Sequence, residues 1–112
     1  MILELEKHKI SVIGLGYVGL PLAIELGKKY ETIGFDINPD RVNQLSLGFD
    51  STNELSENEI KSSKKISFSN KIEDIADSTI YIVSVPTPID EDNNPDLSPL
   101  LSATKMISKF VK

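Results

Sequence analysis

The stretch that decides the fold runs from Lys9 to Asp36 and reads KISVIGLGYVGLPLAIELGKKYETIGFD. An apolar run at 10–13 stops at three glycines with the spacing G-x-G-x-x-G, namely Gly14, Gly16 and Gly19. A second apolar run at 33–35 stops at Asp36. Short, nearly all-apolar runs are typical of parallel strands that are covered on both faces. The stretch therefore predicts a strand, a helix and a second strand, with glycines at the first junction and an acid at the end.

Each glycine of this spacing has a physical reason in a dinucleotide-binding unit. Gly14 permits a tight turn in which a Cβ would clash. Gly16 has no side chain, so the backbone can approach a pyrophosphate closely, and Gly19 lets the helix pack against the first strand. The glycine spacing by itself is weak, because a glycine-rich turn can occur without a ligand. Here the strand, the helix and the acid all fall where the fold needs them, which favours dinucleotide binding.

The predicted phosphate contacts are main-chain groups. No basic residue lies between Lys9 and Lys28. The phosphates must therefore be held mainly by N–H groups at the start of the helix, where the helix dipole is positive. Asp36 would accept hydrogen bonds from the adenosine ribose hydroxyls and repel a 2′-phosphate, which favours NAD over NADP. The candidate residues of the loop are Gly14, Leu15, Gly16, Tyr17, Val18 and Gly19.

Composition indicates a globular protein with one small domain, which we assign to residues 1–112. The chain has 39% apolar and 26% charged residues, a net charge of −5 and no cysteine. The negative charge argues against a nucleic-acid partner. No apolar run approaches membrane-spanning length, and the N-terminus lacks the apolar core of a signal peptide; both suit a cytoplasmic location. Without cysteine, the chain holds no disulfide, thiolate metal site or cysteine nucleophile.

The first helix is predicted from Tyr17 to Lys29. Pro21 falls in its opening turn, where the missing N–H of proline matters little. We expect its buried stripe, at four-residue spacing, to consist of Val18, Leu22 and Leu26.

Start and stop signals delimit the remaining elements. Asn38-Pro39 is typical of a helix cap followed by proline at the first helical position, and Gly48 of the end of that helix. Ser56–Glu59 forms a capping box, and Asn70–Glu73 repeats its pattern. The predicted strands are 9–13, 32–35, 66–68 and 79–85. The predicted helices after the first are 39–47, a short one ending near 62, another short one after 70, and 98–111.

The strand at 79–85 ends in Val85-Pro86-Thr87-Pro88, where two prolines stop the strand and stiffen the turn. In an open parallel sheet, ligands bind beyond the carboxyl ends of the strands. The loop at 14–19, Asp36 and the segment at 85–88 should therefore converge. Thr87 would place a hydroxyl near the nicotinamide ribose or phosphate, or the segment is only a rigid turn. Arg41 could reach over the adenine or ribose, or it is a solvated helix cation.

No metal site and no catalytic residue are predicted in this chain. The residues 90, 92, 94 and 96 alternate as acids and an asparagine, like the start of a calcium loop. The match then fails, because the glycine position holds Pro95 and the position of the bidentate glutamate holds Leu101. A solvated acidic loop fits this pattern better. His8, the only histidine, stands just before the first strand and is interpreted as a solvated residue.

The expected fold class is α/β, a doubly wound (Rossmann) parallel sheet with strand order 3-2-1-4 and right-handed crossovers. Two further strands normally extend the strand-four side of such a sheet. We expect the sheet to be truncated here, with an exposed edge or an apolar patch. Self-association or weak stability should follow.

Taken together, the motifs resemble those of the UDP-glucose/GDP-mannose dehydrogenase family. The matching text is IGLGYVGLP at 13–21, GFDIN at 34–38 with Arg41, and VPTP at 85–88. The text NPDLSPL at 94–100 is similar to the branch that oxidises UDP-N-acetylhexosamines for surface polysaccharides such as capsules. The resemblance extends over nearly the whole chain, from about Lys9 onward.

This resemblance implies an oxidation in two steps, in which the C6 alcohol of a UDP-sugar becomes a carboxylate and two NAD are reduced. It also implies a longer, homo-oligomeric enzyme whose catalytic cysteine, lysine and asparagine lie downstream of the matched region. The chain would then be an N-terminal fragment that does not catalyse the reaction by itself. The NAD contacts that the resemblance implies are Val18, Asp36, Arg41 and Thr87, with Val85 and Pro86 beside the last of these.

Two other interpretations stay open. Another NAD oxidoreductase, such as a 3-hydroxyacid dehydrogenase, could share this first half, although the VPTP and NPDLS text argues against it. A non-catalytic nucleotide-binding module is the second alternative.

Overall fold

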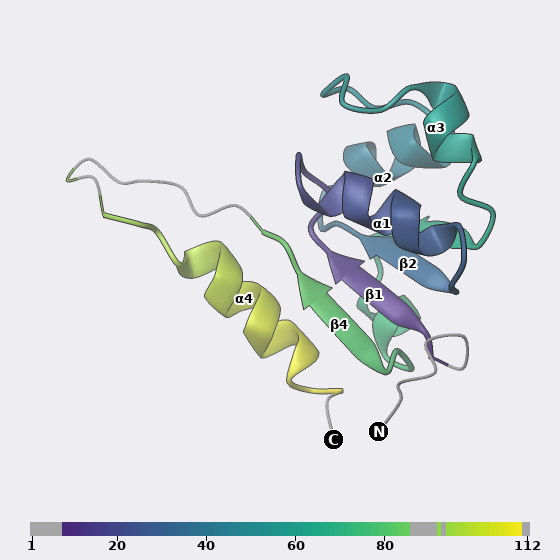
Figure 1. The fold of residues 1–112 in the computed structure, drawn as a ribbon. Helices are drawn as coiled ribbons and strands as arrows, with labels where there is room; N and C mark the ends of the chain where they lie inside the picture. Colours follow the sequence, from purple (N-terminus) through teal and green to yellow (C-terminus); the bar gives the residue numbers. More distant parts are fainter. Residues whose placement is uncertain (1–7, 86–91, 93, 111–112) are drawn as a thin grey trace.

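Four parallel strands and the helices that connect them make up the fold (Figure 1). The computed structural model describes residues 8–85, 92 and 94–110. The strands are β1 (Ile10–Ile13), β2 (Thr32–Phe35), β3 (Ile66–Ser69) and β4 (Ile80–Val83). The α-helices are α1 (Gly19–Gly27), α2 (Pro39–Ser46), α3 (Glu57–Lys61) and α4 (Ser98–Ile107), and a 3-10 helix, η2, spans Ile72–Ile75.

The sheet has the order β3-β2-β1-β4, and every pairing in it is parallel. Both the fold class and the strand order predicted from the sequence are thus confirmed. Ile13 lies in register with Phe35 on one side and with Val83 on the other. Because these three strands end level with one another, Gly14, Asp36 and Ser84 all follow at the same edge of the sheet.

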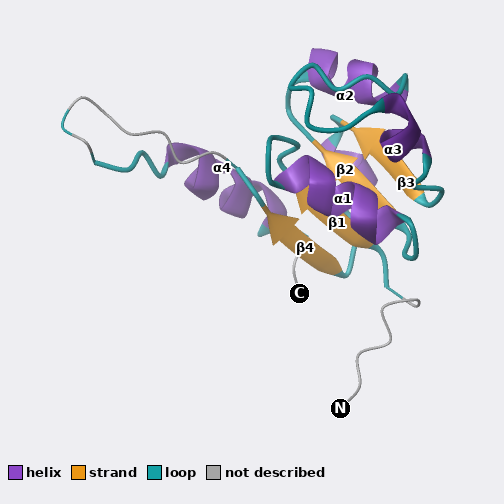
Figure 2. Ribbon diagram, turned by 45° about the horizontal axis from the view of Figure 1, so that its top comes forward, coloured by secondary structure: helices purple, strands orange, loops and turns teal. Residues whose placement is uncertain are grey.

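The two faces of the sheet carry separate apolar clusters, because successive side chains of a strand point to opposite faces. On one face, Ile10 and Val12 pack with buried residues of α1, α2 and α3. On the other face, Ile13, Ile33 and Phe35 pack with Ile75 of η2 and Ala103 of α4. The pictures agree: α1 to α3 lie on one side of the sheet (Figure 2), and α4 lies along β4 (Figure 1).

Helix α1 turns a different face inward from the one predicted. Val18 and Leu22 are 72% and 36% exposed, so the expected stripe is wrong at these two positions, whereas Leu26 is partly buried and packs against the core. Small residues at four-residue spacing decide the orientation, since they let the helix approach the sheet closely: a Cβ on Gly27 would lie 2.7 Å from Cβ of Ile66. Apolar residues lie on several sides of this helix, so the hydropathy pattern does not indicate which face is buried. The buried positions are Gly19, Leu20, Ala23, Ile24 and Gly27.

Most predicted helix signals are confirmed. The Asn38 side chain accepts from the N–H groups of Asp40 and Arg41. Gly48 follows α2 with φ +87°, and Ser56 and Glu59 make both bonds of a capping box.

The predicted cap at Asn70 is wrong. Strand β3 continues to Ser69, whose Oγ accepts from Lys71 N at 3.0 Å and pairs with Asp74. Ser69 therefore takes the place that the sequence pattern gave to Asn70, and the N-cap Lys71 has no side-chain cap.

Strand β4 and helix α4 are shorter than predicted. Strand β4 spans four residues and is only half-buried along its length, because it lies at the border of the sheet. Helix α4 ends at Ile107, and the predicted end at 111 lies outside the described residues. Among the residues that the structure describes, no helix has the length and apolar content that a bilayer crossing requires.

Candidate dinucleotide site

Two glycines of the loop after β1 are required by the fold itself. Gly14 has φ +100°, and its N–H donates to the Phe35 carbonyl at 2.8 Å. A Cβ there would lie 2.3 Å from the Ser84 carbonyl oxygen. A Cβ on Gly19 would lie 1.8 Å from the Gly14 carbonyl oxygen. The roles predicted for these two glycines, a tight turn and close packing of α1 against the end of β1, are confirmed.

Gly16 has no such reason among the residues that the structure describes. Its φ lies outside the left-handed region, and a Cβ there would meet no atom of the described residues within 4 Å. The neighbouring side chains are also turned outward, Tyr17 being 67% and Val18 72% exposed. The middle of the loop therefore presents bare main chain to the outside.

The start of α1 differs from those of α2 and α3. Its N-cap is Val18, which makes no side-chain cap bond, and its first turn holds no acid. Helices α2 and α3, by contrast, are capped by Asn38 and Ser56. An uncapped helix start has N–H groups and a positive dipole end available for an anion.

The peptide groups of Leu15 are held from two sides. Asp36 Oδ2 accepts from Leu15 N at 3.0 Å, and Arg41 Nε donates to Leu15 O at 2.8 Å. Asp36 Oδ1 accepts from Asn38 N at 3.0 Å. The Leu15 side chain belongs to the core and is 1% exposed. The predicted ribose acid and the predicted cation thus flank the same residue of the glycine loop.

Arg41 is not a solvated helix cation. Its Nη1 donates to Asp50 Oδ1 at 2.8 Å, and the side chains of the pair are 10% and 0% exposed. Its Nη2 is buried and has no hydrogen-bond partner among the described residues. Whether this donor meets the adenine or ribose stays a prediction.

Asp50 is the residue of this region that the sequence analysis missed. Burial alone raises the pKa of a carboxyl, but hydrogen bonds from Thr52, Arg41 and Leu55 outweigh it and lower the pKa of Asp50 to about 2. The only local signal is an aspartate followed by Ser-Thr-Asn, a sequence typical of an Asx turn. That signal predicts a turn but says nothing about burial or about Arg41.

The tip after β4 approaches the glycine loop, as predicted for convergent strand ends. Ser84 N donates to Ile13 O at 2.7 Å, and its carbonyl faces Gly14. Val85 is half-buried and packs on the cluster that contains Phe35. Pro86 and Thr87 lie outside the described residues, so their predicted contacts stay predictions.

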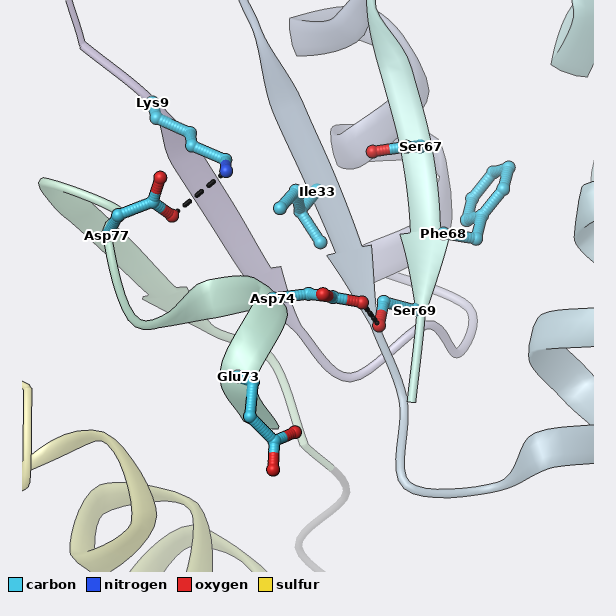
Figure 3. A pocket seen from close by; sticks show the side chains of 8 residues that line it. All are labelled: Lys9, Ile33, Ser67, Phe68, Ser69, Glu73, Asp74 and Asp77. Atoms are coloured by element: carbon cyan, nitrogen blue, oxygen red, sulfur yellow. Dashed lines mark hydrogen bonds and ion pairs between the residues drawn. The ribbon is translucent and has the colours of Figure 1, made fainter. Parts of the chain in front are cut away.

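A recess of about 420 Å³ lies on the η2 side of the sheet (Figure 3). Four of its polar side chains are paired with one another: Lys9 Nζ donates to Asp77 at 2.9 Å, and Ser69 donates to Asp74 at 2.5 Å. None of its lining residues belongs to the glycine loop, and Asp36 and Arg41 are not among them. The recess is therefore separate from the loop at the ends of the strands.

The described residues contain no group of three or more histidines or acids placed to hold a metal ion. Asp92 and Asp96 of the acidic loop are in this described part, whereas positions 90 and 91 are outside it.

Comparisons with known proteins point to one family. The family model described as "UDP-glucose/GDP-mannose dehydrogenase family, NAD binding domain" matches residues 8–112. UDP-N-acetyl-D-glucosamine 6-dehydrogenase of Pseudomonas aeruginosa is 49% identical over 108 residues, 96% of this chain and 26% of that protein. The enzyme of the same name from Salmonella typhi is 43% identical over 103 residues, 92% of this chain and 24% of that protein.

A solved structure shares the fold as well. The UDP-N-acetyl-mannosamine dehydrogenase Cap5O from S. aureus matches with a TM-score of 0.80 and 33% identity, over 93% of this chain and 26% of that one. The chain spans about a quarter of the length of the curated relatives it matches.

Proposed function

The chain belongs to the UDP-glucose/GDP-mannose dehydrogenase family, whose NAD-binding domain it matches, and from this premise we propose that residues 14–19 hold the diphosphate of NAD. The family resemblance and NAD as cofactor, both predicted from the sequence, are confirmed by this membership. The individual contacts are our proposal.

Gly16 is the observation that carries the proposal. The described residues explain Gly14 and Gly19 by backbone clashes, but they give no steric reason for a glycine at 16. A missing side chain there is useful if something outside the chain approaches the main chain closely, as a diphosphate does. In the first turn of α1 the Leu20 N–H donates to Gly16 O at 3.1 Å and Pro21 has no N–H, so the main chain of the loop, together with the positive dipole end of α1, would face the diphosphate.

Asp36 and Arg41 fit the adenosine side of the cofactor. Each oxygen of Asp36 accepts one main-chain N–H and keeps a further lone pair for a ribose hydroxyl. Its charge disfavours the extra phosphate of NADP. The Nη2 of Arg41 is buried and has no hydrogen-bond partner among the described residues, and its contact with the adenine or ribose is part of the proposal. Val85, Pro86 and Thr87 would contact the nicotinamide side.

For the whole protein we propose the oxidation of a UDP-N-acetylhexosamine, or of UDP-glucose, at C6 to the uronic acid. The names of the relatives support a UDP-sugar substrate. NAD takes up the hydride in each of the two oxidation steps, and this chain binds and orients it. Catalytic residues would lie outside this chain. A cytoplasmic homo-oligomer serving surface polysaccharide synthesis completes the proposal.

The family match favours this function over the two alternatives. A 3-hydroxyacid dehydrogenase would share the glycine loop but not the family model that covers residues 8–112. A non-catalytic nucleotide-binding module would use the same loop, so the binding experiment below tests the site and not the downstream chemistry.

The test is calorimetric titration of the chain with NAD and with NADP. We expect NAD to bind more tightly than NADP because of Asp36. Gly16→Ala should weaken NAD binding by about tenfold or more. This factor corresponds to the loss of one hydrogen bond to a charged group. Ser67→Ala, on the exposed side of β3 at the separate recess, is the matched control and should bind NAD like the wild type.

Equal binding of NAD and NADP would contradict the role of Asp36. Unchanged NAD affinity in Gly16→Ala would contradict the placement of the diphosphate on the loop.

A further inference from the structure

We propose that Asp50, which lies outside the glycine loop, is a positioning residue that sets the direction of the Gly16 N–H through Arg41. The inference rests on the proposed function, because the ligand it serves is the diphosphate of NAD. It extends the site from the loop at 14–19 to the segment that follows α2, which Figure 2 shows on the same side of the sheet as α1.

The first step is that Asp50 is itself immobilised. Its side chain is fully buried and accepts from five donors. Oδ1 accepts from Arg41 Nη1 at 2.8 Å, Thr52 N at 3.0 Å and Thr52 Oγ1 at 2.7 Å. Oδ2 accepts from Glu54 N and Leu55 N, both at 3.0 Å. The chain from 50 to 55 therefore wraps around one carboxylate and fixes its plane.

The second step is that a fixed Asp50 fixes Arg41. The guanidinium is planar, so its donors keep constant directions relative to one another. With Nη1 on Asp50 Oδ1 at 2.8 Å, Nε is directed at Leu15 O, also at 2.8 Å. The arginine spans the distance between the segment after α2 and the glycine loop.

The third step follows from the planarity of the peptide bond. Leu15 C=O and Gly16 N–H belong to one peptide unit, and no described peptide bond is cis. In a trans unit the C=O and the N–H point in opposite directions. Since Arg41 draws Leu15 O toward the buried Arg41–Asp50 pair, the Gly16 N–H is turned away from it, toward the open side of the loop.

The alternative is that Asp50 only closes the loop from 50 to 55. That role would change stability but would not act on position 16. Thr52→Val provides the matched control, because it removes one bond to the same carboxylate oxygen and leaves Arg41 in place. Asp50→Asn disturbs both the loop and the arginine.

The experiment compares Asp50→Asn, Thr52→Val and the wild type by NAD calorimetry and by amide NMR. We expect Asp50→Asn to weaken NAD binding by about tenfold, as for a misaligned binding group. Its Gly16 amide resonance should also shift in the absence of NAD. Thr52→Val should keep NAD affinity within about twofold and leave the Gly16 resonance in place. In an Arg41→Met background, Asp50→Asn should weaken NAD binding further by less than about twofold, because Arg41 is no longer present to transmit the effect.

Arg41→Lys covers the case in which Asp50→Asn does not fold. It keeps a positive charge beside Asp50 but lacks the rigid fork that also reaches Leu15 O, so it should shift the Gly16 amide as well. Normal NAD affinity and an unchanged Gly16 amide resonance in Asp50→Asn would overturn the inference. It would also be overturned if Asp50→Asn weakened NAD binding as much in the Arg41→Met background as in the wild type. A wild type that binds no NAD would instead overturn the proposed function, while the amide readout would still decide the inference.

Discussion

At the scale of single residues, the three glycines of the G-x-G-x-x-G motif differ in the steric reason for having no side chain. Gly14 and Gly19 relieve clashes with main-chain atoms 2.3 and 1.8 Å from a Cβ, whereas Gly16 relieves none among the described residues. Two of them serve the fold, and the role proposed for the third is in ligand binding. A stability measurement can separate these roles.

We predict that Gly19→Ala lowers the free energy of unfolding by about 3 kcal/mol or more, because backbone cannot yield as a side chain can. Gly16→Ala should leave the free energy of unfolding unchanged or raise it by up to about 1 kcal/mol, since it only restricts the unfolded chain. Urea unfolding followed by circular dichroism measures both. Equal losses of stability in the two variants would show that Gly16 also has a structural role.

At the scale of elements, helix α2 and the segment after it together hold the glycine loop through hydrogen bonds. Asn38 caps the start of α2, Arg41 in its first turn reaches Leu15, and Asp50 beyond its end holds Arg41. Breaking a buried ion pair leaves the remaining charge without a partner, which is more damaging than the pair is stabilising. The ionisation of Asp50 should therefore be visible in the stability of the chain.

The pKa of Asp50 lies at about 2 in the folded chain, below its ordinary value of 3.8. Because the pKa of Asp50 is lower in the folded chain, its carboxylate stabilises the folded state fully above the unfolded-state pKa. This stabilisation is lost as the pH falls through the folded-state pKa. The difference in unfolding free energy between the wild type and Asp50→Asn should shrink by roughly 2 kcal/mol between about pH 5 and pH 2.

Urea unfolding at a series of pH values measures this difference. Arg41 stays charged throughout, and the other carboxyls are common to both proteins, so their titration cancels in the comparison. A difference that stays constant with pH would contradict an ionised, hydrogen-bonded Asp50.

At the scale of the whole molecule, the β4 side of the sheet is an exposed apolar border. In the part of the chain that the structure describes, β4 pairs with β1 and with no other strand. Beside it, α4 and its N-cap leave three leucines exposed at 39% to 64%: Leu97, Leu100 and Leu101. An unpaired strand edge next to apolar side chains favours association with another chain.

We therefore predict that the 112-residue chain self-associates as its concentration rises, as expected from the sequence. Light scattering over a concentration series measures this. Leu101→Glu, at the most exposed of these leucines, should shift the equilibrium toward monomer, and the matched change Leu47→Glu at the end of α2 should not. A monodisperse monomer at all concentrations would contradict the prediction.

The sequence by itself determined the cap at Asn38 and the capping box at Ser56, because the hydrogen bonds of each lie within one turn of chain. The strands and the two fold-required glycines were also predicted from local patterns, the short apolar runs and the G-x-G-x-x-G spacing, although the residue that Gly14 would clash with, Ser84, is far along the chain. The order of the strands also followed, because chirality leaves few ways to connect such units.

Only the tertiary structure decided which face of α1 is buried and that Asp50 holds Arg41. The helix is apolar on several sides, and its orientation depends on close approach to β3, far away in sequence. The bond from Arg41 to Leu15 spans 26 positions, and the burial of Asp50 comes from the packing around it. Contacts of this kind arise when distant segments meet, so no local pattern carries them.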